Sequence, residues 1–138
     1  MPNILIVSER EPIRCQMREI IERELKQVVI GVAADAEQAL HLLSSHPWKL
    51  AIIDLALPQQ SWVPLLTHLK HQTPPMPALM IGVKTLDDDV PYAWTLGAKG
   101  FLLDDFTPEE FVAAFFSVLH GGTYTNARIM AALNSQLF

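Results

Sequence analysis

Short apolar runs alternate along the chain with longer segments in which apolar residues recur every three or four positions. The runs are typical of buried strands, and a recurrence close to 3.6 residues indicates amphipathic helices. The runs predict five strands, at residues 4–7, 28–33, 50–54, 78–81 and 100–103. The longer segments predict five helices, at residues 12–27, 35–45, 61–71, 87–97 and 107–120.

Five β-α units in succession predict an α/β fold, in which a parallel sheet carries helices on both faces. No linker-like segment interrupts the chain before residue 122, so residues 1–122 are expected to form one domain. Residues 123–138 are a C-terminal extension, and their apolar positions from residue 126 onward favour a sixth helix or the start of a linker.

Composition narrows the class of protein. Half of the 138 residues are hydrophobic and the net charge is −5, so we expect a compact domain that does not bind nucleic acid directly. No apolar run is long enough to span a bilayer, and the N-terminus lacks a signal-peptide pattern. Cys15 is the only cysteine, which rules out an intramolecular disulfide. These features favour a cytoplasmic protein without a membrane partner.

Asp54 is the main candidate for a functional residue. It ends the apolar run at residues 50–54, which is expected to be a strand buried on both faces. In open parallel sheets, ligands bind at the carboxyl ends of the strands. Asp54 is therefore expected at the chemically active edge of the sheet.

Three motifs, together with Asp54 and the following Pro58, resemble the receiver domain of two-component response regulators. The motifs are GAKGFLL at residues 97–103, TPEE at 107–110 and GGTY at 121–124, and they are most similar to the NarL/FixJ type. The resemblance implies a doubly wound (βα)5 fold of the CheY-like or flavodoxin-like kind. It implies a parallel five-stranded sheet with the strand order 2-1-3-4-5.

The resemblance also implies a site at which a histidine kinase phosphorylates the strand-three aspartate, here Asp54. Such a site uses an acidic pair with Mg²⁺, a hydroxyl residue after strand four, a lysine after strand five and an aromatic residue on strand five. This chain departs from most of that pattern. The matching positions are Ser8 and Glu9 for the acidic pair, Gly82 for the hydroxyl, Asp104 for the lysine and Phe101 for the aromatic residue.

The charges at these positions argue against conventional phosphorylation. Asp54, Glu9 and Asp104 have no matched cation, and a phosphate dianion beside Asp104 would be repelled in a partly buried site. Without a hydroxyl at Gly82, a phosphate would also lose its link to the loop after strand four. We therefore predict that phosphorylation of Asp54 is absent or ineffectual. No cofactor is expected, and Mg²⁺ binding is not favoured.

Two basic residues could substitute for the missing cation. Arg10 lies two residues beyond Ser8, and Lys84 lies two residues beyond Gly82. Either side chain could hold the site in one state, although each alone is also explained as a solvated loop charge.

A divalent metal site is an alternative interpretation of the same acids. Glu9, Asp54 and Asp104 could form an all-carboxylate site, and a weaker version uses Glu9, Asp54 and the backbone of Ala56. Otherwise the carboxylates would repel one another and relieve this by protonation or by turning outward.

The helix predicted at residues 107–120 is apolar nearly all round. A helix that covers one face of a sheet needs only one apolar stripe, so the surplus favours a homodimer contact. The candidate residues for this surface are Phe111, Phe115, Phe116 and Leu119. The alternative is that residues 123–138 fold back over this helix.

The sequence thus predicts an atypical receiver domain of a bacterial response regulator, not an enzyme, that acts in transcriptional control through protein–protein contacts. Its expected partners are a second copy of the chain and a histidine kinase or another signalling protein. The resemblance implies a DNA-binding domain after residue 138. One alternative is a phosphorylatable receiver in a phosphorelay that uses Asp54 with altered chemistry. Another is a phosphohydrolase with Asp54 as nucleophile, which is disfavoured because Ala56 stands where the second acid is expected.

Overall fold

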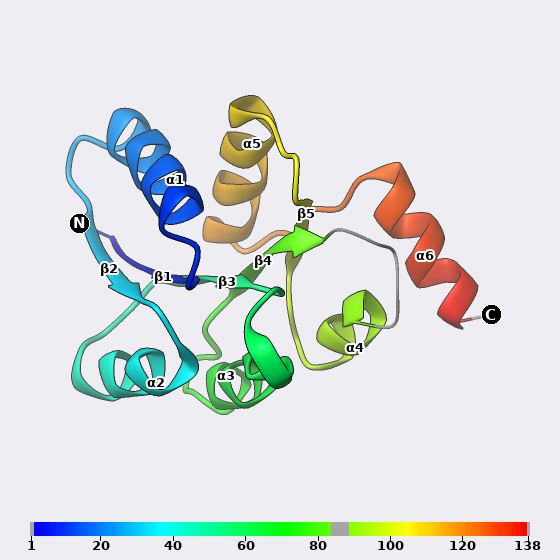
Figure 1. Ribbon diagram of the computed structural model, residues 1–138, viewed down its shortest axis with the longest axis horizontal. Helices are drawn as coiled ribbons and strands as arrows, with labels where there is room; N and C mark the ends of the chain where they lie inside the picture. Colours follow the sequence, from blue (N-terminus) through cyan, green and yellow to red (C-terminus); the bar gives the residue numbers. More distant parts are fainter. Residues whose placement is uncertain (1, 84–88, 138) are drawn as a thin grey trace.

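The computed structural model describes residues 2–83 and 89–137 and contains a parallel sheet of five strands (Figure 1). The strand order is β2-β1-β3-β4-β5, which confirms the order that the resemblance to receiver domains implied. The strands are β1 (Asn3–Val7), β2 (Val29–Ala33), β3 (Leu50–Asp54), β4 (Ala78–Val83) and β5 (Gly100–Leu103).

Helices cover both faces of the sheet, with α1 and α5 on one face and α2, α3 and α4 on the other (Figure 1). Their bounds agree with the predicted helices to within a few residues, and the predicted start at residue 87 lies outside the described residues. The helices are α1 (Glu11–Glu24), α2 (Ala36–Ser45), α3 (Trp62–Lys70), α4 (Asp89–Thr95), α5 (Pro108–Leu119) and α6 (Ala127–Leu137), with a short 3₁₀ turn η1 (Pro58–Gln60).

β3 is buried along its whole length because it supplies both cores. Leu50 and Ile52 pack into the core on the α1 and α5 face, whereas Ala51 and Ile53 pack into the core on the opposite face. Successive side chains of a strand point to opposite faces, so a strand covered on both sides needs an unbroken apolar run. This requirement explains the apolar run that ends at Asp54.

Helix starts follow the local sequence signals. Asp35 accepts a hydrogen bond from the Gln38 N–H at the start of α2. Thr107 and Glu110 form a reciprocal capping box at the start of α5. Such caps satisfy N–H groups that have no partner within the helix.

The C-terminal extension packs against the rest of the fold. The Phe101 N–H donates to the Tyr124 carbonyl at 3.0 Å, and the Tyr124 N–H donates to the Lys99 carbonyl at 3.1 Å, which places Tyr124 beside β5. Ile129 and Leu133 on α6 are buried in the core on the α4 side of the sheet. α6 therefore packs beside α4 (Figure 1), and it does not lie over α5 as one interpretation expected.

None of the helices in the described part of the chain has the length and apolar character that crossing a bilayer requires.

Candidate functional site

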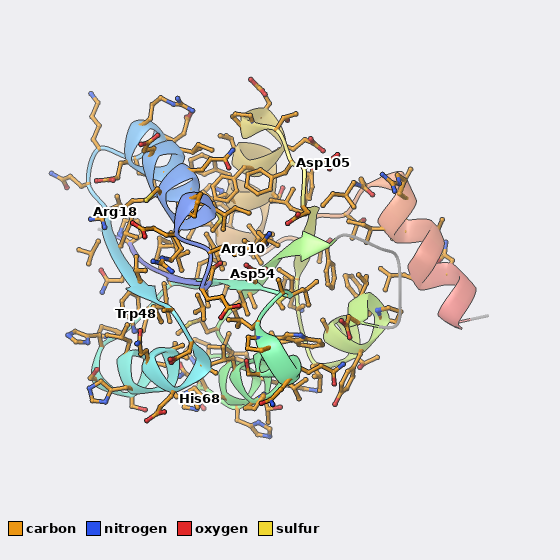
Figure 2. All side chains as sticks on the ribbon, in the orientation of Figure 1. Arg10, Arg18, Trp48, Asp54, His68 and Asp105 are labelled. Carbon is orange, nitrogen blue, oxygen red and sulfur yellow. The ribbon has the colours of Figure 1, made fainter. Side chains whose placement is uncertain are left out.

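Asp54 lies at the carboxyl end of the central strand and is only 1% exposed. Strand order places β1 on one side of β3 and β4 on the other, so the loop after β1 and the end of β4 both lie next to Asp54. Figure 2 shows the labelled side chains of Arg10 and Asp54 close together at this edge of the sheet.

The Asp54 carboxylate accepts four hydrogen bonds. Its Oδ1 accepts from Arg10 Nη2 and from the Ala56 N–H, both at 2.9 Å. Its Oδ2 accepts from Arg10 Nε at 2.8 Å and from the Ser8 hydroxyl at 2.7 Å. A carboxylate offers about four acceptor positions, so this set satisfies the group completely. A buried charge needs such compensation to be stable in the folded state.

Arg10 joins two carboxylates. Two of its nitrogens bind Asp54 in a bidentate fork, and Nη1 donates to Asp104 Oδ1 at 2.8 Å. This geometry suits the rigid, planar guanidinium group. The two carboxylates raise the pKa of Arg10 above its ordinary value, chiefly through the hydrogen bonds to Asp54, although partial burial lowers it. Arg10 is therefore cationic wherever the protein is folded.

The backbone around Ser8 holds Arg10 in place. The Arg10 N–H donates to the Ser8 hydroxyl oxygen at 3.1 Å, and Arg10 adopts an extended conformation just before α1. The Ser8 N–H donates to the Ala33 carbonyl at 3.0 Å, and Arg14 on α1 donates to the Ser8 carbonyl at 2.6 Å. Ser8 thus connects the loop after β1 to β2, to α1 and to Asp54.

Gly82 provides the space that the arginine uses. Its backbone has a φ of +86°, and a Cβ at this position would lie 2.5 Å from Asp54 Oδ1 and 2.9 Å from Arg10 Nη2. A side chain here would collide with the ion pair and would also strain the backbone. Gly82 therefore lacks the hydroxyl that the resemblance implies, and it also leaves room for the Arg10–Asp54 ion pair.

Two other predicted site residues that the structure describes, Glu9 and Phe101, form no hydrogen bond with this cluster. Glu9 is exposed, and Phe101 is fully buried with its ring centroid 6.3 Å from that of Trp94. Lys84 lies outside the described residues. Among the residues that the structure describes, no group of three acids, histidines or cysteines could hold a metal ion.

The all-carboxylate hypothesis loses support, because Arg10 forms ion pairs with both Asp54 and Asp104. The weaker version of that site also loses support, because all of the Asp54 acceptor positions are already used. The Ala56 N–H donates one of the hydrogen bonds that Asp54 accepts.

The turn after β3 connects the site to α4, a connection that the sequence analysis did not anticipate. Gln59 and Gln60 have left-handed conformations, with φ of 59° and 51°. The Gln60 side chain donates to Asp89 at the start of α4 at 2.8 Å. The buried Trp62 ring makes an edge contact with Tyr92 on α4, with centroids 5.7 Å apart. The sequence signal for this connection is limited to the two glutamines that directly follow Pro58.

Two of the four candidate dimer residues are not on the surface. Phe111 and Phe115 are 0% and 1% exposed, because they pack in the core between α5 and the sheet. Phe116 and Leu119 are only partly buried and pack against the same core. The surplus of apolar residues on α5 is thus partly explained by burial within one chain.

Sequence comparison identifies the family to which this site belongs. The sequence profile described as "Response regulator receiver domain" matches residues 4–116. The chain is a member of this family. The receiver is 25% identical over 134 residues to the nitrate/nitrite response regulator protein NarL of Escherichia coli (strain K12). The aligned region covers 97% of this chain and 62% of NarL. It is 30% identical over 118 residues to the transcriptional regulatory protein MalR of Bacillus subtilis (strain 168). The aligned region covers 83% of the receiver and 48% of MalR.

Solved structures show the same fold. A LuxR-family two-component response regulator from Aurantimonas sp. SI85-9A1 matches with a TM-score of 0.85 and 23% identity, over 98% of this chain and 96% of that one. The isolated receiver domain of RcsB from Salmonella enterica serovar Typhimurium, solved with the phosphomimetic BeF3⁻, matches with a TM-score of 0.74 and 18% identity, over 96% and 98% of the two chains. The receiver spans about 62% of the length of NarL.

Replacement of Arg10 tests the ion pair. Arg10→Met keeps much of the side-chain length but leaves Asp54 buried without a counter-charge. We expect the free energy of unfolding to fall by about 3 kcal/mol, the lower end of the range for breaking a buried ion pair, since Arg10 is partly exposed. Urea denaturation followed by circular dichroism measures this change.

A matched control is Arg18→Met, which removes an exposed ion pair with Glu22 on α1. That substitution is expected to change the free energy of unfolding by about 0.5 kcal/mol or less. Equal costs for the two substitutions would show that the Arg10 pair does not stabilise the fold.

Gly82→Ala tests whether this glycine makes room for Arg10. Gly121 has a similar φ of +92° but no heavy atom within 4 Å of a built Cβ, so Gly121→Ala measures the backbone strain alone. That strain is about 1–2 kcal/mol. We expect Gly82→Ala to cost more than Gly121→Ala in urea denaturation, and the excess to shrink when Arg10 is also replaced by alanine. An unchanged excess in the double variant would contradict the coupling.

Proposed function

We propose that this receiver domain acts through protein–protein contacts and that aspartyl phosphorylation does not control it. The observation that carries the proposal is the bidentate ion pair between Arg10 and the buried Asp54, extended to Asp104. The guanidinium occupies the space beside Asp54 where the family resemblance implies a metal ion and a phosphoryl group. Arg10 thus acts as a built-in cation that holds the site in one state.

Geometry and charge both oppose phosphorylation of Asp54. A nucleophilic carboxylate oxygen must be free to attack, whereas each Asp54 oxygen accepts two hydrogen bonds. The Arg10–Asp54 ion pair would have to open first, and opening leaves the buried Asp54 charge without its counter-charge. Asp104, which stands where the family resemblance implies a lysine, would then repel the incoming phosphate.

The residues present do not fit Mg²⁺. Hard cations bind carboxylate, carbonyl and water oxygens. Ser8 donates its hydroxyl proton to Asp54, Glu9 is exposed, and both Asp54 oxygens are bound by Arg10. A magnesium ion would have to displace a guanidinium with three hydrogen bonds to carboxylates.

The alternative is a receiver that remains phosphorylatable. Its support is that Asp54 is retained at the carboxyl end of β3, next to the Ala56 N–H. On this alternative, opening of the Arg10 pair would be the step that limits phosphorylation.

Exposure to a phosphodonor separates the two functions. We expect no phosphoprotein on a phosphate-affinity gel, and no saturable change in tryptophan fluorescence, after treatment with Mg²⁺ and acetyl phosphate or beryllofluoride. Trp62 is a suitable reporter because it is fully buried beside the turn that follows β3. A receiver with the acidic pair, hydroxyl and lysine is the positive control. Phosphoryl uptake that is lost in Asp54→Asn would overturn the proposal.

The partners follow from the family and from the surface. We propose a homodimer, with a histidine kinase or another signalling protein acting by contact and not as phosphodonor. The full-length protein is proposed to carry a DNA-binding output domain, because the chain spans only part of NarL and MalR. The partly exposed Phe116 and Leu119 on α5 support the dimer.

The dimer is tested by sedimentation equilibrium. We expect the apparent mass of the wild-type chain to rise toward twice the chain mass with concentration, and Phe116→Lys to weaken this association by burying a charge. Met130→Lys on α6 is the matched control, since Met130 is an apolar side chain that is 45% exposed. A wild-type chain that stays monomeric at high concentration, or equal effects of the two lysines, would rule out this surface.

A further inference from the structure

A cavity of about 380 Å³ lies at the edge of the sheet opposite Asp54. It is bounded by the end of α3, the loop at residues 75–77, the turn at residues 96–99 and the two glycines after α5. Ala78 begins β4 and Lys99 directly precedes β5, so the cavity lies at the amino-terminal ends of these strands. β4 runs from this cavity to Gly82 beside Asp54, and the two sites are therefore separate.

The walls of the cavity are apolar and fixed by backbone hydrogen bonds. The Met76 N–H donates to the Leu69 carbonyl at 3.1 Å, which ties the proline-rich loop to α3. The Lys99 N–H donates to the Ala78 carbonyl at 3.0 Å, and the Gly122 N–H donates to the Ser117 carbonyl at 2.8 Å. A cavity with fixed walls needs little ordering when a ligand binds.

Two lysines border this apolar space. Lys70 comes from the end of α3 and Lys99 from the start of β5, and both are exposed. The Lys70 stem lies close to the turn at residues 96–99, since a Cβ on Gly97 would be 3.9 Å from Lys70 Cδ. Within the described residues, no carboxylate pairs with either lysine, and the cavity lining contains no acid. Two cations without partners are therefore concentrated here, in a chain with a net charge of −5.

We propose that this cavity binds a small organic acid that has an apolar body and one carboxylate. The apolar walls would bury the body, and the lysine ammonium groups would form charge-assisted hydrogen bonds with the carboxylate. The volume is near the lower end of the roughly 300–1,000 Å³ range of small-molecule sites, which favours a compact ligand. No aromatic side chain lines the described cavity, so a nucleobase would find no stacking partner.

Titration with octanoate, followed by ¹H–¹⁵N NMR, tests the proposal on the intact chain. Five of the six glycines provide the readout, because Gly97, Gly121 and Gly122 line the cavity while Gly31 and Gly82 lie elsewhere on the sheet. We expect saturable shifts of the three cavity glycine amides and no shift of the other two. Octanol, which has a similar apolar body but no charge, is expected to bind more weakly.

Variants separate the lysines from the apolar walls. Lys70→Gln combined with Lys99→Gln is expected to weaken octanoate binding roughly tenfold, the effect of losing one good charge-assisted hydrogen bond. Lys26→Gln, at an exposed lysine after α1, is the matched control and should leave the affinity unchanged. The proposal is overturned by a lack of saturable shifts at millimolar octanoate or by equal shifts at Gly31 and Gly82. Equal binding of octanol, or octanoate binding that does not depend on the lysines, also overturns it.

Discussion

A buried carboxylate needs a counter-charge, and in this receiver Arg10 supplies it. Asp54 is almost completely buried at the end of the central strand, where an uncompensated charge would cost several kcal/mol. The arginine reaches it from the loop after β1 and at the same time binds Asp104 after β5. One side chain thus holds together three of the loops at the carboxyl edge of the sheet.

The departures from the family pattern at Ser8, Gly82 and Asp104 all accommodate the ion pair between Arg10 and Asp54. Ser8 donates a hydrogen bond to Asp54 where a second carboxylate would repel it. Gly82 leaves the space that Arg10 Nη2 occupies, and Asp104 accepts a hydrogen bond from Arg10 Nη1. Each of these positions taken alone departs from a group that the family resemblance implies for phosphorylation. Taken together they form a complete hydrogen-bonded ion pair, which is why the fold tolerates all of them.

The sequence predicted the fold well because periodicity and capping are local signals. Apolar runs, Asp35 and the TPEE motif determine strands and helix starts without knowledge of the tertiary structure. It could not choose between Arg10 and Lys84, since the direction of a loop side chain depends on contacts distant in sequence. The error at Phe111 and Phe115 was avoidable. These residues lie one turn apart and share a stripe with Val118, and such a stripe at helical spacing indicates a core face.

The locked ion pair also changes how the site can communicate with α4. Gly82 has no side chain to carry a signal from Asp54 along β4. The turn after β3 still connects to α4, through the Gln60–Asp89 hydrogen bond and the Trp62–Tyr92 ring contact. Two left-handed glutamines in this turn store strain of about 1–3 kcal/mol each, and such strain persists only where surrounding contacts enforce it. Those contacts and the packing of α6 hold α4 in place. If the receiver works as proposed, the position of α4 is set by this packing and not by the state of Asp54. A partner that recognises α4 would then find a permanent surface, which is what a receiver without a phosphorylation switch requires.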